Sequence, residues 1–198
     1  MNLNRRLVLS LSAACPLSLI SPARAQVTVE GYTFARETLV AGQTLRLNGV
    51  GLRAVAWLKG YATGLYLAAK ATTPQAVVAA GGAKRLQLRM LQEVPAEEFV
   101  KAFDKGVARN TPAGELPALK ERMQRFNALV MGLVKVKKGD LVDLDWLPET
   151  GLQFSHNGRV LGAPIAGADL YGALLRIFVG QRPVDPEMKI GLLGGPVG

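Results

Sequence analysis

Two adjoining stretches decide the fold: LRLNGVGLRAVAWL at residues 45–58 and KGYATGLYL at residues 59–67. Both are rich in apolar residues, and the second begins with Lys59-Gly60, where we expect the chain to turn. This arrangement is typical of two long strands joined as a hairpin. We therefore expect the hairpin to form the centre of a sheet, with the other elements arranged around it.

Arg53 stands out in this hairpin because its neighbours are apolar. Alternate residues of a strand share one face, so an uninterrupted strand places Arg53 beside Leu45 and Leu47. Gly49 and Gly51 leave a second possibility, a bulge that exchanges the two faces. A guanidinium on an apolar face needs an anion or hydrogen-bonding partners. The alternative is that its stem packs on the sheet while its head reaches solvent.

Strand and helix patterns alternate along the rest of the chain. Further strands are predicted at residues 27–30, 32–40, 84–91, 140–147, 151–156 and 159–165. Helices are predicted at residues 74–81, 95–110, 116–133, 168–179 and 185–192. This order predicts an α+β fold in which the helices lie on one side of a large antiparallel sheet. The length of the chain fits one such domain, at residues 26–198.

The first 25 residues have the pattern of an export signal. Arg5 and Arg6 form a basic start, an apolar stretch follows, and Ala23-Arg24-Ala25 resembles a cleavage site. The paired arginines suit a twin-arginine signal, and a general secretory signal fits nearly as well. The apolar stretch is too short and too interrupted to span a membrane. We therefore expect an exported protein, periplasmic in a bacterium.

Residue counts exclude several kinds of site. Cys15 is the only cysteine and lies in the predicted signal, so the mature chain has no thiol nucleophile, disulfide or cysteine-bound metal. His156 is the only histidine, which argues against a metal site built from several histidines. Ser155 is its neighbour in a predicted strand, so the two side chains point to opposite faces and cannot form a nucleophile–base pair. We expect no metal and no cofactor.

The charge is basic, with a formal net charge of +9 that falls to +6 once the three arginines of residues 1–25 are removed. An excess of this size favours an anionic ligand or an anionic surface. The basic residues are dispersed and not interleaved with aromatic residues, which argues against nucleic acid as a partner.

A set of short motifs, in this order, resembles the chalcone isomerase-like family, and most closely its exported bacterial branch. The set comprises GLRAV at 51–55, YATGLYL at 61–67, VPAEEF at 94–99, KGD at 138–140, NG at 157–158, IAG at 165–167, LLRIFVG at 174–180 and PVDPEMK at 183–189. The resemblance implies an open-faced β-sandwich, in which a large antiparallel sheet is covered by a layer of helices with a ligand cleft between them.

The resemblance also implies a cofactor-free chemistry that this chain matches only in part. Plant chalcone isomerases add a phenolate to an enone within one molecule, helped by oriented polar groups. Arg53 falls on the family's cleft arginine, and Tyr61 falls where a threonine is expected. Other polar positions of the plant enzymes fall on apolar or small residues, namely Phe99, Ala102, Gly106 and Ile177.

Three functions are open, of which the first two follow from the resemblance. The first is a non-catalytic binder of an apolar carboxylate such as a fatty acid, as in the plastid branch of the family, with Arg53 as anion anchor. Tyr61 or Tyr66 would be a second donor, and Trp57, Phe99 and Phe103 would line the cleft. The second is an isomerase or intramolecular lyase acting on another enone-type substrate. The third is an envelope accessory protein that acts through protein contacts.

Overall fold

The computed structural model describes residues 26–55 and 58–197. The strands are β1 (Gln26–Val29), β2 (Tyr32–Ala35), β3 (Glu37–Val40), β4 (Gln43–Val55), β5 (Leu58–Leu67), β6 (Lys84–Met90), β7 (Val94–Pro95), β8 (Lys135–Val136), β9 (Leu141–Leu147), β10 (Gly151–His156) and β11 (Arg159–Ile165). The helices are α1 (Pro74–Ala79), α2 (Ala96–Asn110), α3 (Leu116–Met131), α4 (Ala168–Val179) and α5 (Pro186–Leu192). The predicted signal peptide at residues 1–25 and the predicted site residue Trp57 lie outside the described residues.

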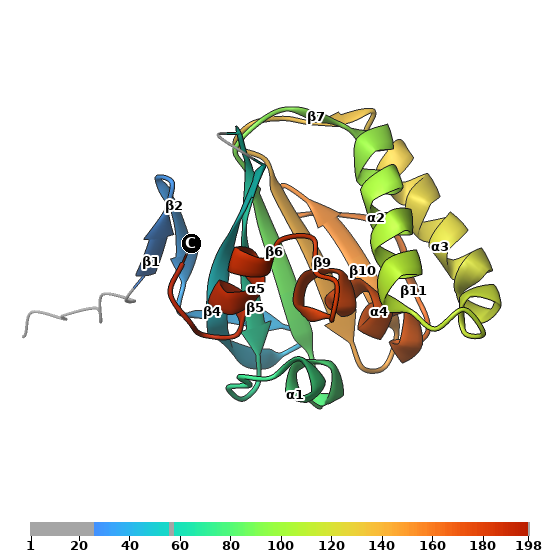
Figure 1. Ribbon diagram of the computed structural model, residues 1–198, viewed down its shortest axis with the longest axis horizontal. Helices are drawn as coiled ribbons and strands as arrows, with labels where there is room; N and C mark the ends of the chain where they lie inside the picture. Colours follow the sequence, from blue (N-terminus) through green and yellow to red (C-terminus); the bar gives the residue numbers. More distant parts are fainter. Residues whose placement is uncertain (1–25, 56–57, 198) are drawn as a thin grey trace, which may run out of the picture.

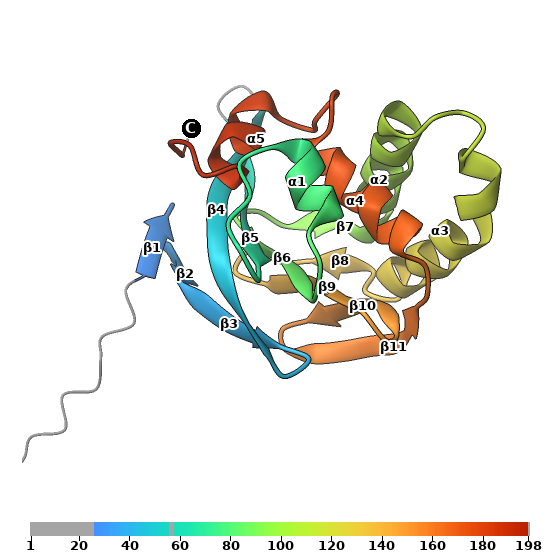
Figure 2. The same ribbon diagram turned by 90° about the horizontal axis from the view of Figure 1, so that it is seen from below.

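Seven antiparallel strands form the main sheet, in the order β11-β10-β9-β6-β5-β4-β3. The helices lie on one side of this sheet, and the short β1–β2 hairpin stands beside β4 (Figure 1; Figure 2). The sheet is strongly curled. Thr38 on the edge strand β3 accepts a hydrogen bond of 3.0 Å from Arg85 on β6, three strands away in the sheet. The predicted α+β fold, with an antiparallel sheet covered by helices, is confirmed.

A bulge in β4 decides which way Arg53 faces. The pairing with β5 shifts between Leu47 and Gly49, so Asn48 is the extra residue. Leu47 belongs to the core on the face away from the helices, whereas Gly49 and the residues that alternate with it face the helices. Arg53 therefore does not share a face with Leu47. The sequence left open either an uninterrupted strand or a bulge that exchanges the two faces, and the structure has the bulge.

Asn48 holds the bulge in place and is almost completely buried, with 2% of its surface exposed. Its side-chain amide donates to the carbonyls of Ala71 and Leu192, and its side-chain oxygen accepts from the N–H of Ala71. These bonds tie β4 to the segment before α1 and to the end of α5. The bulge is thus a fixed part of the fold.

Two glycines of β4 allow α5 to pack directly on the strand. A Cβ atom on Gly49 would lie 2.0 Å from the carbonyl oxygen of Gly191, and one on Gly51 would lie 2.4 Å from that of Met188. Only a residue without a side chain permits this backbone-to-backbone approach. The approach brings the beginning of α5 next to Arg53, near the end of β4.

Candidate functional site

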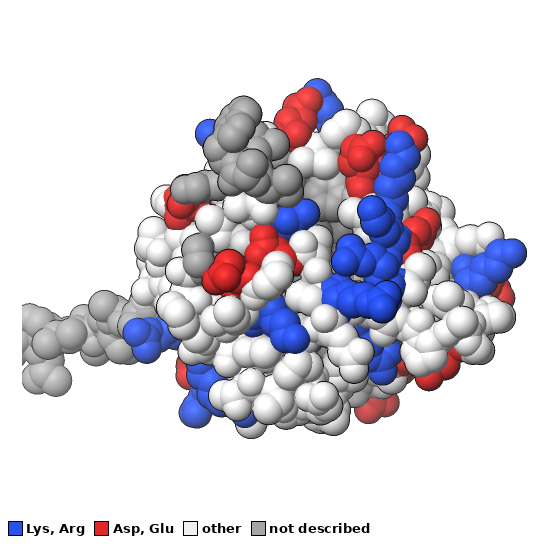
Figure 3. Space-filling model, viewed as in Figure 1, with Lys and Arg blue, Asp and Glu red and all other residues white. Residues whose placement is uncertain are grey.

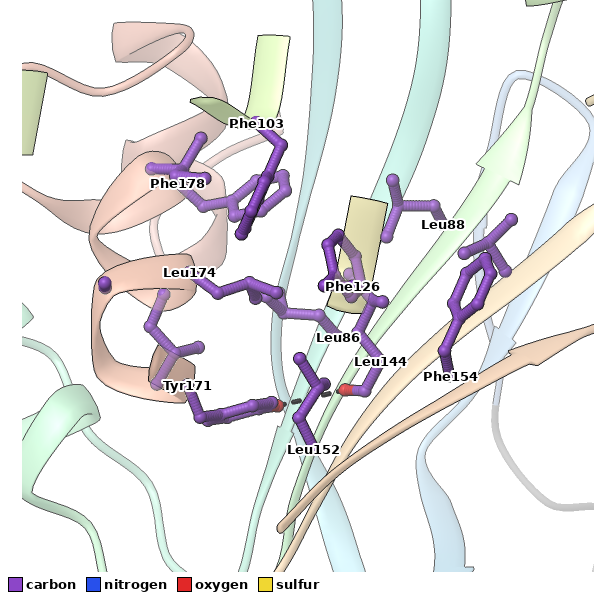
Figure 4. Packing of buried hydrophobic residues seen from close by; sticks show 14 of the residues in the cluster. Leu86, Leu88, Phe103, Phe126, Leu144, Leu152, Phe154, Tyr171, Leu174 and Phe178 are labelled. Atoms are coloured by element: carbon purple, nitrogen blue, oxygen red, sulfur yellow. Dashed lines mark hydrogen bonds between the residues drawn. The ribbon is translucent and has the colours of Figure 1, made fainter. Parts of the chain in front are cut away.

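An apolar cavity of about 90 Å³ lies between the sheet and the helices α2, α3 and α4. Its wall includes Leu88 and Leu144 of the sheet, Phe103 of α2, Phe126 of α3, and Leu174 and Phe178 of α4. Figure 4 shows these side chains converging from the helices and the sheet. Two of the rings pack closely, with 4.6 Å between the centroids of Phe103 and Phe126. The apolar faces of α2 and α3 therefore form a cavity wall as well as part of the core.

The cavity reaches the surface at one end. Ala102 of α2 lines it and is exposed, while Tyr61, Phe99 and Val184 line it and are half-buried. The rings of Tyr61 and Phe99 lie 6.5 Å apart, centroid to centroid, so β5 and α2 meet at this opening. A ligand entering here would pass between the sheet and α2.

Arg53 stands at the same end of the cavity. It lies directly opposite Tyr61 in the β4–β5 pairing, so both side chains start from the helix-facing side of the sheet. About a quarter of the Arg53 side chain is exposed (26%). Its Nη1 atom donates 2.9 Å to the carbonyl of Ala54 and lies 3.4 Å from Oδ2 of Asp185. The guanidinium is therefore half-buried and has an internal counter-charge.

Asp185 is the residue that sequence reasoning did not connect to the site. It is the N-cap of α5, and its Oδ1 accepts the N–H groups of Glu187 and Met188. Its Oδ2 accepts the N–H of Ala54 at 3.3 Å and contacts Arg53. The Asp-Pro pair signals a helix start, but no local signal could show that this carboxylate meets an arginine 132 residues earlier.

The phenol of Tyr61 stays protonated at ordinary pH. Burial raises its pKa to about 12, with Arg53 lowering it and Asp185 raising it by their charges. A neutral phenol can donate a hydrogen bond to an anion near Arg53. This end of the cavity thus combines the guanidinium of Arg53, the neutral phenol of Tyr61 and the carboxylate of Asp185.

The structure brings together four of the predicted site residues and separates a fifth. Arg53, Tyr61, Phe99 and Phe103 lie at or in the cavity. Tyr66 lies on the opposite face of the sheet, buried in the second core. Burial there raises its pKa to about 12, with smaller effects from Arg85 and other charges beside it. Tyr66 therefore cannot serve as the second donor beside Arg53.

Two further grooves lie outside the predicted site. These grooves, of about 530 and 630 Å³, are lined in part by charged residues, and neither contains a predicted site residue. Within residues 26–55 and 58–197, no group of three or more His, Cys, Asp or Glu side chains is placed to hold a metal ion. No helix of that part of the chain is long and apolar enough to cross a membrane.

Comparisons with known proteins agree with the fold. A fatty-acid binding protein of Arabidopsis thaliana has a similar structure, with a TM-score of 0.64 and 17% sequence identity over 85% of this chain and 96% of that chain. The comparison with curated protein sequences found no match. The chalcone isomerase-like family matches residues 26–194, nearly the whole described chain. The chain belongs to the chalcone isomerase-like family.

Proposed function

We propose that this protein is a non-catalytic binder of an apolar carboxylate, such as a fatty acid, held in the cavity with Arg53 as the anion anchor. The observation that carries the proposal is the pairing of Arg53 and Tyr61 at the open end of an apolar cavity. An alkyl chain needs the apolar wall, and a carboxylate needs the two donors.

The guanidinium can accept a second anion. Both of its hydrogen bonds to Ala54 and Asp185 use Nη1, and the contact with Asp185 is long at 3.4 Å. A guanidinium has five N–H donors, and its Nε–Nη2 edge matches a carboxylate in two parallel bonds. The phenol of Tyr61, opposite Arg53, would supply a third bond.

The surface beside the opening is also cationic. Lys101, Lys105 and Arg109 are exposed at four-residue intervals along α2, and Figure 3 shows Lys and Arg side chains gathered over this helix. Lys101 pairs with Glu97 and Glu98, each at about 3 Å. The row as a whole favours the approach of an anion to the opening.

The cavity must widen to hold a long chain. A cavity of about 150 Å³ holds one benzene molecule, and the space here is about 90 Å³. The contacts that must loosen are those between α2 and α3, where the rings of Phe103 and Phe126 meet. We expect ligand binding to be accompanied by a change in these aromatic contacts.

The residues around the cavity favour binding over catalysis. Four positions that carry or neighbour polar groups in plant chalcone isomerases are Phe99, Ala102, Gly106 and Ile177 in this chain. Three of them line the cavity, and the fourth, Gly106, contacts Ile177. Each oriented donor lost from an anion site typically costs about 3 to 4 kcal/mol of catalysis. The similarity in structure to a fatty-acid binding protein supports the same conclusion.

The experiment is a titration of the mature protein with a fluorescent fatty acid. Arg53→Gln should weaken binding about 10- to 150-fold, the loss of one charged hydrogen-bonding partner. The control is Arg46→Gln, which removes an exposed arginine of the same strand that lies 3.8 Å from Glu37. Equal affinity of wild type and Arg53→Gln would remove Arg53 from the site, and no saturable binding by the wild type would overturn the function.

Export remains a proposal from the sequence of residues 1–25. If it is correct, the protein recovered from its own host starts at or near Gln26. Mass spectrometry of the intact protein measures this directly. A chain that keeps residues 1–25 would contradict the proposal.

A further inference from the structure

The turn between α3 and β8 exposes apolar side chains that the fold does not use. We call residues 131–138, from the last residue of α3 through β8 to Lys138, the docking turn. Within it, 47% of Met131 and 77% of Val134 is exposed, and Val134 is the most exposed of the large apolar side chains in the described chain. Single exposed apolar residues are common, but two within four residues, beside a cavity wall, need a reason.

Val134 also has an unfavourable backbone conformation. Its φ is +62°, in the left-handed region that β-branched residues rarely adopt. Its carbonyl accepts the N–H of Ala96 at 2.9 Å, and its own N–H donates to Met131 at 3.1 Å, so the neighbours hold it there. Glycine or asparagine would adopt this conformation with less strain. A strained valine that points into solvent indicates a role outside the fold.

The charges around the turn indicate what it contacts. Residues 131–138 contain Lys135, Lys137 and Lys138 and no acidic residue, and all three lysines are exposed. The next acidic residue, Asp140, is held by His156, Asn157 and the N–H of Lys137. Lys135 lies 2.9 Å from Glu93, which leaves the other two as the main positive charges. An apolar tip flanked by cations suits an anionic lipid surface, where side chains enter the acyl boundary and lysines meet headgroups. A stable protein interface needs about 1,200 Å² or more, far more than two side chains offer.

The same turn forms part of the cavity wall. Leu133 and Val136 line the cavity. Val134, which lies between them in the sequence, and Met131, which precedes them, are exposed on the outer side. The turn contains β8, which pairs with β7, and α2 begins directly after β7. Phe99, which lines the open end of the cavity, lies in the first turn of α2. A surface bound by the turn is therefore on the side of the cavity that the beginning of α2 and the end of α3 enclose.

We infer that the docking turn binds an anionic lipid surface and places the cavity where it can exchange a ligand with that surface. The exchange of ligand depends on the proposed function, whereas the binding to lipid does not. The two are tested by different variants, so failure of one is distinguishable from failure of the other.

The experiment measures partition of the mature protein onto vesicles of phosphatidylcholine alone and of phosphatidylcholine with a quarter phosphatidylglycerol. The wild type should bind the anionic vesicles. The double variant Met131→Asn/Val134→Asn should bind them at least about tenfold more weakly, since two apolar side chains no longer enter the lipid. Lys137→Gln and Lys138→Gln should each lower binding about fivefold.

Two controls separate lipid contact from folding. Leu39→Asn changes an apolar residue on β3 whose exposure, 65%, lies between those of Met131 and Val134, and it should leave partition unchanged. Asparagine suits the left-handed backbone at residue 134, so the unfolding temperature of Val134→Asn should stay the same or rise. Its binding to anionic vesicles should fall. A purely structural role of Val134 would not lower vesicle binding without also lowering stability. Arg53→Gln should weaken fatty-acid binding and keep vesicle binding. Equal partition of the wild type and the double variant, or no binding to either vesicle, overturns the inference.

Discussion

The carboxylate of Asp185 lies 3.4 Å from the guanidinium of Arg53, so the residue that begins α5 also supplies the counter-charge for the arginine of β4. One oxygen caps the helix and the other faces the cation. In the proposed complex, a ligand carboxylate binds the Nε–Nη2 edge of Arg53 and is repelled by the negative charge of Asp185 nearby. The charge of Asp185 is therefore expected to limit the affinity for anionic ligands.

Asp185→Asn should tighten fatty-acid binding, since it removes the competing charge and keeps a side chain that caps helices well. We expect an increase in affinity of about tenfold, equivalent to about 1.4 kcal/mol. A titration with a fluorescent fatty acid measures this. The matched variant Asp185→Ala should lose about 1 kcal/mol of stability through the lost cap. Weaker binding by Asp185→Asn with unchanged stability would show that Asp185 helps to bind the ligand.

Sequence patterns were sufficient for the order of the helices and the longer strands and for the helix faces, but they joined β2 and β3 into one strand and missed the two-residue strands β7 and β8. Phe99 and Phe103 are four residues apart, so the helix predicted at residues 95–110 carries both on one face, and the structure places both at the cavity. These features are local, because side chains three or four residues apart share a helix face whatever the rest of the fold does.

Features that depend on distant residues were not predictable. The direction of Arg53 depends on the bulge at Asn48, and that bulge is held by hydrogen bonds to Ala71 and Leu192. The assignment of Tyr66 to the site is wrong for a different, local reason. Tyr61 and Tyr66 are an odd number of residues apart in one strand, so they lie on opposite faces. That spacing was visible in the sequence and could have excluded Tyr66.

Gly51→Ala should destabilise the fold by displacing α5. The added Cβ would lie 2.4 Å from the carbonyl oxygen of Met188, a backbone atom that cannot rotate away. Overpacking of this kind typically costs about 1 to 3 kcal/mol. Urea unfolding measures the loss, and Gly114→Ala is the control, because nothing lies within 4 Å of its added Cβ. Equal stability of the Gly51 and Gly114 variants would mean that α5 is not packed on β4 in this way.

Ala102→Phe should block the cavity without loosening the fold. Ala102 lines the opening and is exposed, so a larger side chain can occupy the entrance without entering the core. We expect fatty-acid affinity to fall at least about tenfold while the unfolding temperature changes little. Ala108→Phe serves as the control, since Ala108 is exposed on the same helix and does not line the cavity. Unchanged affinity of Ala102→Phe would place the ligand elsewhere.

Asp140 should make the fold sensitive to acid. Burial alone raises the pKa of this carboxyl, but hydrogen bonds from Asn157, the N–H of Lys137 and His156 outweigh that effect and lower the pKa to about 2. The carboxylate contacts these three groups at 2.8 to 2.9 Å. Because the folded-state pKa lies below the ordinary value of 3.8, the stabilisation is present above pH 3.8 and is lost as the pH falls toward 2.

Asp140→Asn should therefore be less stable than the wild type near neutral pH and should lose less stability as the pH falls through this range. Urea unfolding at several pH values measures both effects. Asn157→Gly removes one donor and keeps the left-handed turn, whose φ is +51°, so it should show a smaller change of the same sign. If the wild type and Asp140→Asn lose stability in parallel between pH 3.8 and 2, then the carboxylate network does not set the acid sensitivity.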